Sequence, residues 1–472
     1  GDEWPMGDGE VAGRRDGDEP ATAPALASVG RVLMAAGGAR VLVLPVTGLC
    51  NLVIARLVTQ AVGIDHFGVI MLVATLSQLL MFADLGTGAA VASARAQVND
   101  SAIGVDNFRG TTLTAIRTTL VSGAILGFGA ALVGVLGAWP WLLGFHQQDL
   151  ASSLNISAVL ALSAFAVALP FAVGEAVLRG SGRMHEAVVL QGISPPSALV
   201  LTIIFRQIEV PDLAYALVLP AGALFAAICC ALRAWTVDRA SVRGLVSKIA
   251  RPRRFPGLPI AATAVPMFVV MIGLPVALQS DRIIISHRLD PISLSDYSYA
   301  SQLYIPLWSV VSIAALALWP HFATGLSDRA ALRKGWITGL LILSGTGVAI
   351  AAGFLLFARY LIGWMSDGQA SPSWSLLLAF ALLLVVQSVH VTTGILLIAP
   401  DKLRFQAVCV VALVIANLPL SWILTPTLGA AGPVYASAIT VLVCQLIPGV
   451  VVGARTTRPD SSPQPVGKPT DA

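Results

Sequence analysis

Long apolar stretches separated by short polar segments run through almost the whole chain. A helix needs about 20 mainly apolar residues to cross the hydrocarbon core of a bilayer. Twelve stretches meet this requirement, at 36–56, 67–92, 113–137, 153–176, 186–205, 212–234, 258–280, 297–320, 336–357, 373–398, 404–424 and 431–453. The predicted fold class is therefore an all-α polytopic membrane protein with about 12 transmembrane helices.

A basic stretch from Arg233 to Arg254 divides these helices into two groups of six. It holds seven Lys or Arg residues and a single acid, Asp238. Because each charge near the bilayer centre costs about 2.5–3.5 kcal/mol, this stretch must lie in water. The predicted organisation is a disordered cytoplasmic tail (1–34), an N-terminal six-helix bundle (35–235), a basic cytoplasmic linker (236–257), a C-terminal six-helix bundle (258–453) and a second disordered tail (454–472).

Composition and the distribution of charge agree with this topology. The chain is 56% hydrophobic and 11% charged, whereas about 25% of residues are charged in soluble domains. With the linker in the cytoplasm, most of the 29 Lys and Arg residues fall on the cytoplasmic side, as the positive-inside rule requires. Both termini are then cytoplasmic. The net charge of +4 is explained by topology, and no nucleic-acid partner is expected.

Few ionisable side chains lie inside the predicted spans, and a functional role is expected for them because exposure to lipid is costly. Asp84 lies in the second span, Glu175 in the inner third of the fourth, and Arg40 and Arg117 about one turn inside the inner ends of spans one and three. The arginines either snorkel to the interface or line a cavity, where a guanidinium suits a phosphate or pyrophosphate. The acids either pair with these arginines or bind a coupling ion.

Three further candidates lie at the predicted outer ends of the spans. Arg56 follows the first span, and Asp281 and Arg282 follow the seventh. Asp281 and Arg282 either form an interfacial ion pair or contribute to a substrate site.

Motifs of enzymatic chemistry are missing from the sequence. It has no Walker A, GxSxG or HExxH motif, and its five cysteines lack metal or disulfide spacing. We therefore expect no catalytic residue, metal or cofactor, and a transporter rather than an enzyme.

Short motifs follow one another along the chain in a characteristic order: Ile54-Ala55-Arg56-Leu57, His66-Phe67-Gly68, Asp84-Leu85-Gly86-Thr87-Gly88, Leu178-Arg179-Gly180, Asp281-Arg282-Ile283, Trp319-Pro320-His321 and Leu428-Gly429-Ala430. This series resembles bacterial polysaccharide flippases of the Wzx type, in the multidrug/oligosaccharidyl-lipid/polysaccharide (MOP) exporter superfamily. His66-Phe67 and the interruption at 60–62 depart from the family pattern, which leaves the subfamily and the glycan open.

The resemblance implies a MATE-like fold of two pseudo-symmetric bundles in the bacterial plasma membrane. It implies that the protein carries a polyprenyl-pyrophosphate-linked oligosaccharide from the inner to the outer leaflet by alternating access, for cell-surface polysaccharide such as O-antigen. Membrane lipids, a polysaccharide polymerase and glycosyltransferases are the further partners implied. Candidate substrate-binding residues are Arg40, Arg56, Arg117 and Arg282, and candidate ion-pair or coupling residues are Asp84, Glu175 and Asp281.

Two other functions fit the same pattern of spans. A cation-coupled multidrug exporter would keep the fold and use Asp84 or Glu175 as its ion site. An integral-membrane glycan polymerase or ligase would need a large outer loop, and the short predicted outer loops count against it.

Overall fold

The computed structural model of the chain describes residues 23–80, 83, 85–98, 102–145, 148–239, 248–249, 273–316, 329–397 and 402–458. Every regular element in these ranges is a helix and none is a strand, which confirms the all-α fold class. Asp84 lies outside the described residues.

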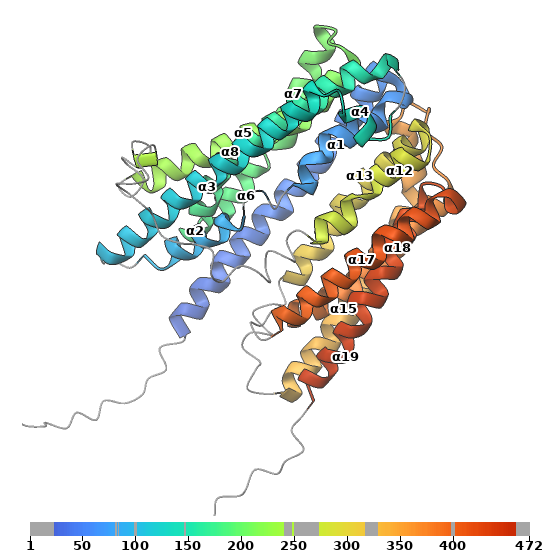
Figure 1. The fold of residues 1–472 in the computed structure, drawn as a ribbon. Helices are drawn as coiled ribbons and strands as arrows, with labels where there is room; N and C mark the ends of the chain where they lie inside the picture. The colour runs from blue at the N-terminus through green and yellow to red at the C-terminus, as the bar shows by residue number, and fades with distance from the viewer. Residues whose placement is uncertain are drawn as a thin grey trace, which may run out of the picture.

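The described helices form two bundles (Figure 1). The N-terminal bundle contains α1 (Ala23–Leu79), α2 (Thr87–Ala96), α3 (Ala102–Val135), α4 (Trp139–Leu142), α5 (Gln148–Gly180), α6 (Met184–Gln191), α7 (Ser194–Gln207), η2 (Asp212–Leu217) and α8 (Val218–Val237). The C-terminal bundle contains α12 (Asp281–Arg288), α13 (Pro291–Leu316), α15 (Arg329–Met365), α16 (Trp374–Leu396), α17 (Leu403–Leu428), α18 (Ala431–Thr440), η5 (Val441–Leu446) and α19 (Ile447–Thr456).

The long element α1 holds two helices that meet at Gly63. The backbone of Gly63 is not helical there (φ 78°, ψ 173°), a conformation that glycine adopts without a Cβ penalty. Thr59 and Met71, on either side of Gly63, both reach α13, where they contact Tyr299 and Gln302. The chain therefore turns back at Gly63, as the boundary between the first two predicted spans requires, although α1 begins at Ala23, before the predicted start at 35.

The second predicted span, 67–92, is not one continuous helix in the structure. Its first part ends at Leu79, and helix resumes at Thr87. Between them Leu85 and Gly86 have positive φ values of 52° and 73°, a left-handed conformation that an α-helix cannot contain.

Nine helices in the described part of the chain are long and apolar enough to cross a membrane. Three of the twelve predicted spans do not appear as separate helices among these nine. The first part of the second span lies in α1 together with the first span. The seventh span is described only from residue 273 onward, and the eighth corresponds to α13. The protein is a multi-pass membrane protein, and twelve spans are compatible with the described helices.

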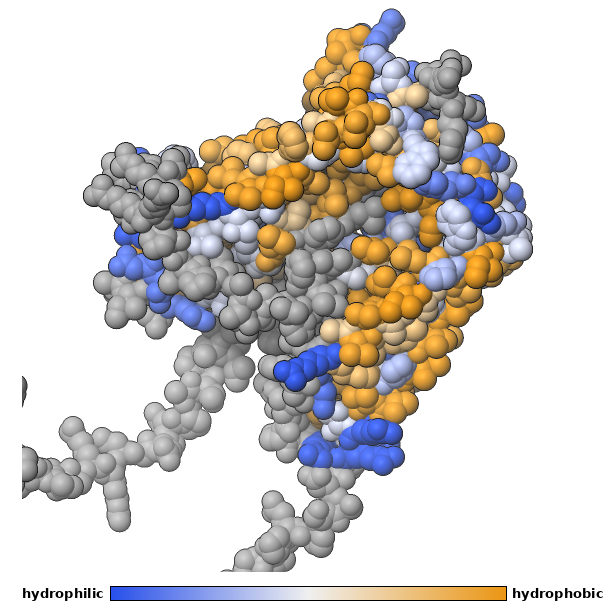
Figure 2. All heavy atoms as spheres, viewed as in Figure 1, coloured by the Kyte–Doolittle hydropathy of each residue, from blue (hydrophilic) through white to orange (hydrophobic). Residues whose placement is uncertain are grey.

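The first and last described residues lie at the same end of the molecule, which we call the terminal end (Figure 1). The bundles diverge toward that end and approach each other at the opposite one, which we call the closed end. Apolar residues cover the flanks, and hydrophilic residues gather toward the two ends (Figure 2), as expected for helices that cross a bilayer.

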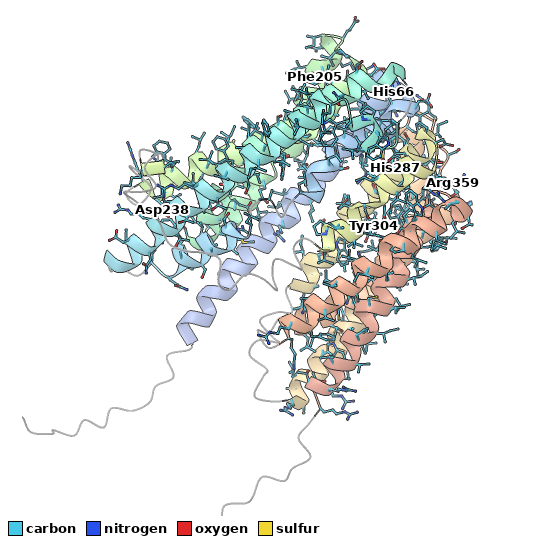
Figure 3. All side chains as sticks on the ribbon, viewed as in Figure 1. His66, Phe205, Asp238, His287, Tyr304 and Arg359 are labelled. Atoms are coloured by element: carbon cyan, nitrogen blue, oxygen red, sulfur yellow. The ribbon has the colours of Figure 1, made fainter. Side chains whose placement is uncertain are left out.

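Two polar contacts within the N-terminal bundle lie at these two ends, where Figure 3 labels Asp238 and His66. At the terminal end Arg95 donates to Asp238 at 2.6 Å, and Ser181 donates to the same oxygen at 3.2 Å. The one acid of the basic stretch thus joins the ends of α2, α5 and α8. At the closed end His66 Nδ1 lies 2.9 Å from Asp212 Oδ2.

The predicted orientation places the terminal end in the cytoplasm, and the two ends of α15 provide a matched test. This helix has 37 residues, so it is roughly 55 Å long and extends beyond a hydrocarbon core of about 30 Å. With the five native cysteines replaced by alanine, we expect Ser371→Cys to react with an impermeant maleimide in intact cells. Ala330→Cys should react only after permeabilisation. The reverse labelling pattern would invert the topology.

Candidate functional site

Polar contacts between α1 and the loop after α15 join the two bundles at the closed end. Arg56 Nη2 lies 2.8 Å from Asp367 Oδ1, and the guanidinium stands 4.9 Å from the centroid of the Trp364 ring. Arg56 also donates to the Trp364 carbonyl. Nearby, the backbone N–H of Ile64 donates to Gln369 Oε1 at 3.2 Å. Arg56, predicted to bind substrate, therefore connects the bundles in this conformation.

The start of α13 approaches the turn of α1 still more closely. Ser295 Oγ donates to the Ile64 carbonyl at 2.5 Å and accepts from the N–H of Gly68 at 2.8 Å. A Cβ placed on Gly68 would lie 2.6 Å from the Ser295 nitrogen, so a side chain there would force the helices apart. Glycine at this position allows the two backbones to meet.

An aromatic pair continues the contact toward the membrane interior. The rings of Phe67 and Tyr299 are stacked, with centroids 4.1 Å apart and planes 5° from parallel. The Tyr299 hydroxyl lies 2.5 Å from Thr59 Oγ1, and all three side chains are buried. We call the contact surface formed by Thr59, Phe67, Gly68, Ser295 and Tyr299 the seam. It closes this end with packed, hydrogen-bonded side chains.

An apolar cavity of about 420 Å³ lies between the bundles, bordered by α1, α13 and α15. Gln302 is the one polar side chain among its lining residues, which are Gly48, Leu52, Gln302, Leu303, Pro306, Leu307, Ile350, Gly353, Phe354, Phe357, Ala358 and Leu361. Such a lining suits hydrocarbon, because the free energy falls when apolar groups leave water. A charged group would meet no compensating partner there.

The two predicted cavity arginines lie in different surroundings. Arg40 is half-buried on α1, on the terminal-end side of the seam. Arg117 on α3 donates to the backbone carbonyls of Ile249 and Lys248, at 3.1 and 2.6 Å. Arg117 therefore binds the basic linker in this conformation.

The remaining candidates have partners inside their own bundles. Glu175 pairs with Arg179, one turn along α5, at 3.3 Å. Asp281 and Arg282 are each only 3% exposed, so neither faces solvent in this conformation. Tyr297 donates to Asp281 Oδ2 at 3.2 Å, and Arg282 donates to Ser301 at 2.6 Å. Asp281 Oδ1 and Arg282 Nε are buried without a hydrogen-bond partner.

Buried uncharged polar residues join helices of the C-terminal bundle, and none of them was among the predicted site residues. The Asn417 amide bonds to Ser437 at 3.0 Å and to Thr440 at 3.2 Å, which joins α17 to α18. Ser421 and Thr425 continue the same face of α17 and are fully buried. The four-residue spacing of Asn417, Ser421 and Thr425 was the available signal, because residues four apart share one face of a helix.

No protein-family model and no curated protein matches this sequence. Solved structures match over most of its length. The inward closed conformation of the lipid II flippase MurJ aligns with a TM-score of 0.65 and 12% identity, over 88% of this chain and 87% of the flippase.

Two conformations of a multidrug resistance MATE family transporter of the MOP superfamily also match. The inward-facing one has a TM-score of 0.58 and 16% identity over 90% of this chain and 94% of the transporter. The outward-facing one has a TM-score of 0.58 and 13% identity over 92% of this chain and 96% of the transporter. At these identities the likeness is one of fold, and the chain has the two-bundle fold of MOP-superfamily transporters.

Proposed function

We propose that this protein carries a polyprenyl-pyrophosphate-linked oligosaccharide from the inner to the outer leaflet of a bacterial plasma membrane by alternating access. The observation that supports this most is the arrangement of the two bundles, which meet at the seam and diverge toward the terminal end (Figure 1). Rocking one bundle against the other would close the terminal end and open the seam. The structure then corresponds to the state that loads substrate from the cytoplasmic leaflet.

The polar contacts beside the seam are few enough to break reversibly. Arg56 and Asp367 are 28% and 44% exposed, and an ion pair at such a site contributes up to about 1 kcal/mol. Each neutral hydrogen bond to Ser295 or Gln369 adds about 0.5–1.5 kcal/mol. A balance of a few kcal/mol is what a transporter needs, because a substrate shifts a conformational equilibrium only by its difference in affinity for the two states.

The chemistry of the space between the bundles favours an amphipathic lipid-linked substrate. The cavity bordered by α1, α13 and α15 offers an almost wholly apolar wall for part of the prenyl chain. Arg40 stands on the same helix, α1, nearer the terminal end, where its planar guanidinium would bind the pyrophosphate. In the cell, glycosyltransferases would supply such a substrate, and a polysaccharide polymerase would consume it.

Replacing Arg40 tests the pyrophosphate site. In proteoliposomes supplied with a labelled polyprenyl-pyrophosphate oligosaccharide, we expect Arg40→Ala to lower the transfer rate by about 10- to 100-fold, because one charge-assisted contact is worth about 1.5–3 kcal/mol. Arg359→Ala is the matched control, since Arg359 stacks on Trp374 at the closed end, and it should transfer at the wild-type rate. Equal rates for both variants would remove Arg40 from the site, and a folded wild type without transfer would refute the proposed function.

Weakening the closed end should shift the conformational equilibrium. Asp367→Asn removes the charge that faces Arg56, so we expect the fraction of molecules open at the seam to rise by a factor of up to about 5. Distances between spin labels placed on the two bundles measure that fraction. Asp65→Asn changes an exposed residue in the turn after Gly63 and should leave the fraction open at the seam unaltered. Equal shifts in the two variants would show that the contact between Arg56 and Asp367 does not hold this end closed.

A cation-coupled multidrug exporter is the second candidate, and the buried Asp281 is the observation that favours it. One oxygen of this carboxyl has no hydrogen-bond partner, and ionisable groups buried within a membrane are often coupling sites. If the protein is such an exporter, wild-type proteoliposomes will expel ethidium against a proton or sodium gradient, and Asp281→Asn will abolish the dependence on that gradient. Absence of ethidium export from vesicles that transfer the lipid-linked oligosaccharide would reject this candidate.

A further inference from the structure

A second cavity, of about 340 Å³, lies inside the C-terminal bundle, where α13, α16, α17 and the segment from η5 to α19 meet. It lies toward the terminal end, because Phe405 near the start of α17 and Gly394 near the end of α16 both line it. Its polar and aromatic lining side chains are Trp308, Gln387, His390, Phe405, Gln406 and Gln445. None of the proposed contacts to pyrophosphate or prenyl chain involves these residues.

The charges of the lining select the class of ligand. No Asp, Glu, Lys or Arg is among the described residues that line the cavity. A cation or an anion bound there would lose its hydration without gaining a counter-charge, which is unfavourable at membrane depth. The described part of the lining therefore suits a neutral ligand.

The hydrogen-bonding groups indicate that this neutral ligand is polar. Gln387 Oε1 accepts from the Tyr304 hydroxyl, and Gln406 Nε2 donates to the Gly394 carbonyl at 3.1 Å. The amide atoms outside these two bonds are a donor on Gln387 and an acceptor on Gln406, and a hydroxyl group binds both kinds. His390 also lines the cavity, and an imidazole ring carries both a donor and an acceptor for hydroxyl groups.

The local backbone places a third amide in the same lining. Gln445 is 8% exposed and belongs to η5, a π-helical segment over Val441–Leu446. Pro448 follows within α19, and because a proline ring clashes with the carbonyl four residues earlier, it disfavours a regular α-helical turn at Cys444. Such π turns occur often at functional sites.

We propose that this cavity binds one neutral, hydroxyl-rich ring, a sugar unit of the transported head group. Small-molecule sites combine an apolar and aromatic wall with a few placed polar groups and span about 300–1,000 Å³. A volume of about 340 Å³ is at the small end of that range, so the cavity selects a sugar unit and not the whole glycan. This assignment rests on the proposed function, because it identifies which part of the proposed substrate the C-terminal bundle binds.

Calorimetric titration of the purified protein in lipid nanodiscs tests the site directly. The probes are free glucose, galactose, mannose, rhamnose, N-acetylglucosamine and N-acetylgalactosamine. We expect at least one of them to bind the wild type, and Gln445→Leu and His390→Phe each to weaken that binding about tenfold, equivalent to about 1.4 kcal/mol. Gln207→Leu makes the same change as Gln445→Leu at an exposed position near the closed end, and its affinity should equal that of the wild type.

Two results would overturn the proposal: no binding of any of these sugars by the folded wild type, or binding that Gln445→Leu and His390→Phe leave unchanged. Near-ultraviolet circular dichroism of each variant excludes misfolding as the cause of a loss. Transfer of the lipid-linked oligosaccharide separates this outcome from the proposed function. A wild type that transfers the substrate without binding free sugars would refute the sugar site alone, whereas sugar binding through Gln445 without any transfer would refute the flippase function alone.

Discussion

The close approach of α1 to the start of α13 determines the shape of the molecule. Gly68 lets the backbone of the second span reach Ser295, and Phe67 stacks on Tyr299 directly beside that contact. Because these groups are buried and packed, the bundles are joined at one end while they diverge at the other (Figure 1). The divergence of the bundles toward the terminal end and the role of Arg56 as a bridge between them both follow from that contact.

Much of the architecture was predictable from hydrophobicity and charge. Stretches of about 20 apolar residues indicate membrane-spanning helices. An unpaired backbone polar group is costly in lipid, and a helix pairs its backbone groups within one segment. Asp238, the one acid predicted within the basic stretch, is paired with Arg95. The break in the second span was not predicted, since Leu85 and Gly86 are apolar or small and leave the mean hydropathy high.

The candidate site was harder to predict because the sequence shows charges but not their partners. Arg117 and Glu175 looked equivalent to Arg40 as charges inside spans, yet the structure pairs Arg117 with the linker and Glu175 with Arg179. Ser295 closes the seam and Gln445 lines the C-terminal cavity. Hydropathy does not distinguish such uncharged residues from other polar residues in apolar helices. Their importance depends on which helix faces which, and only tertiary structure provides that.

In the proposed transport cycle the seam must open for substrate to cross, and a cross-link that holds it shut tests this requirement. Ile64 and Gln369 contact each other across the closed end, so cysteines at these two positions, in a protein without the native ones, can be joined by a short cleavable thiol cross-linker. We expect the cross-linked protein to transfer no lipid-linked oligosaccharide in proteoliposomes and to regain transfer when the cross-link is cleaved. Transfer at the full rate through a quantitatively cross-linked protein would contradict alternating access between these two bundles.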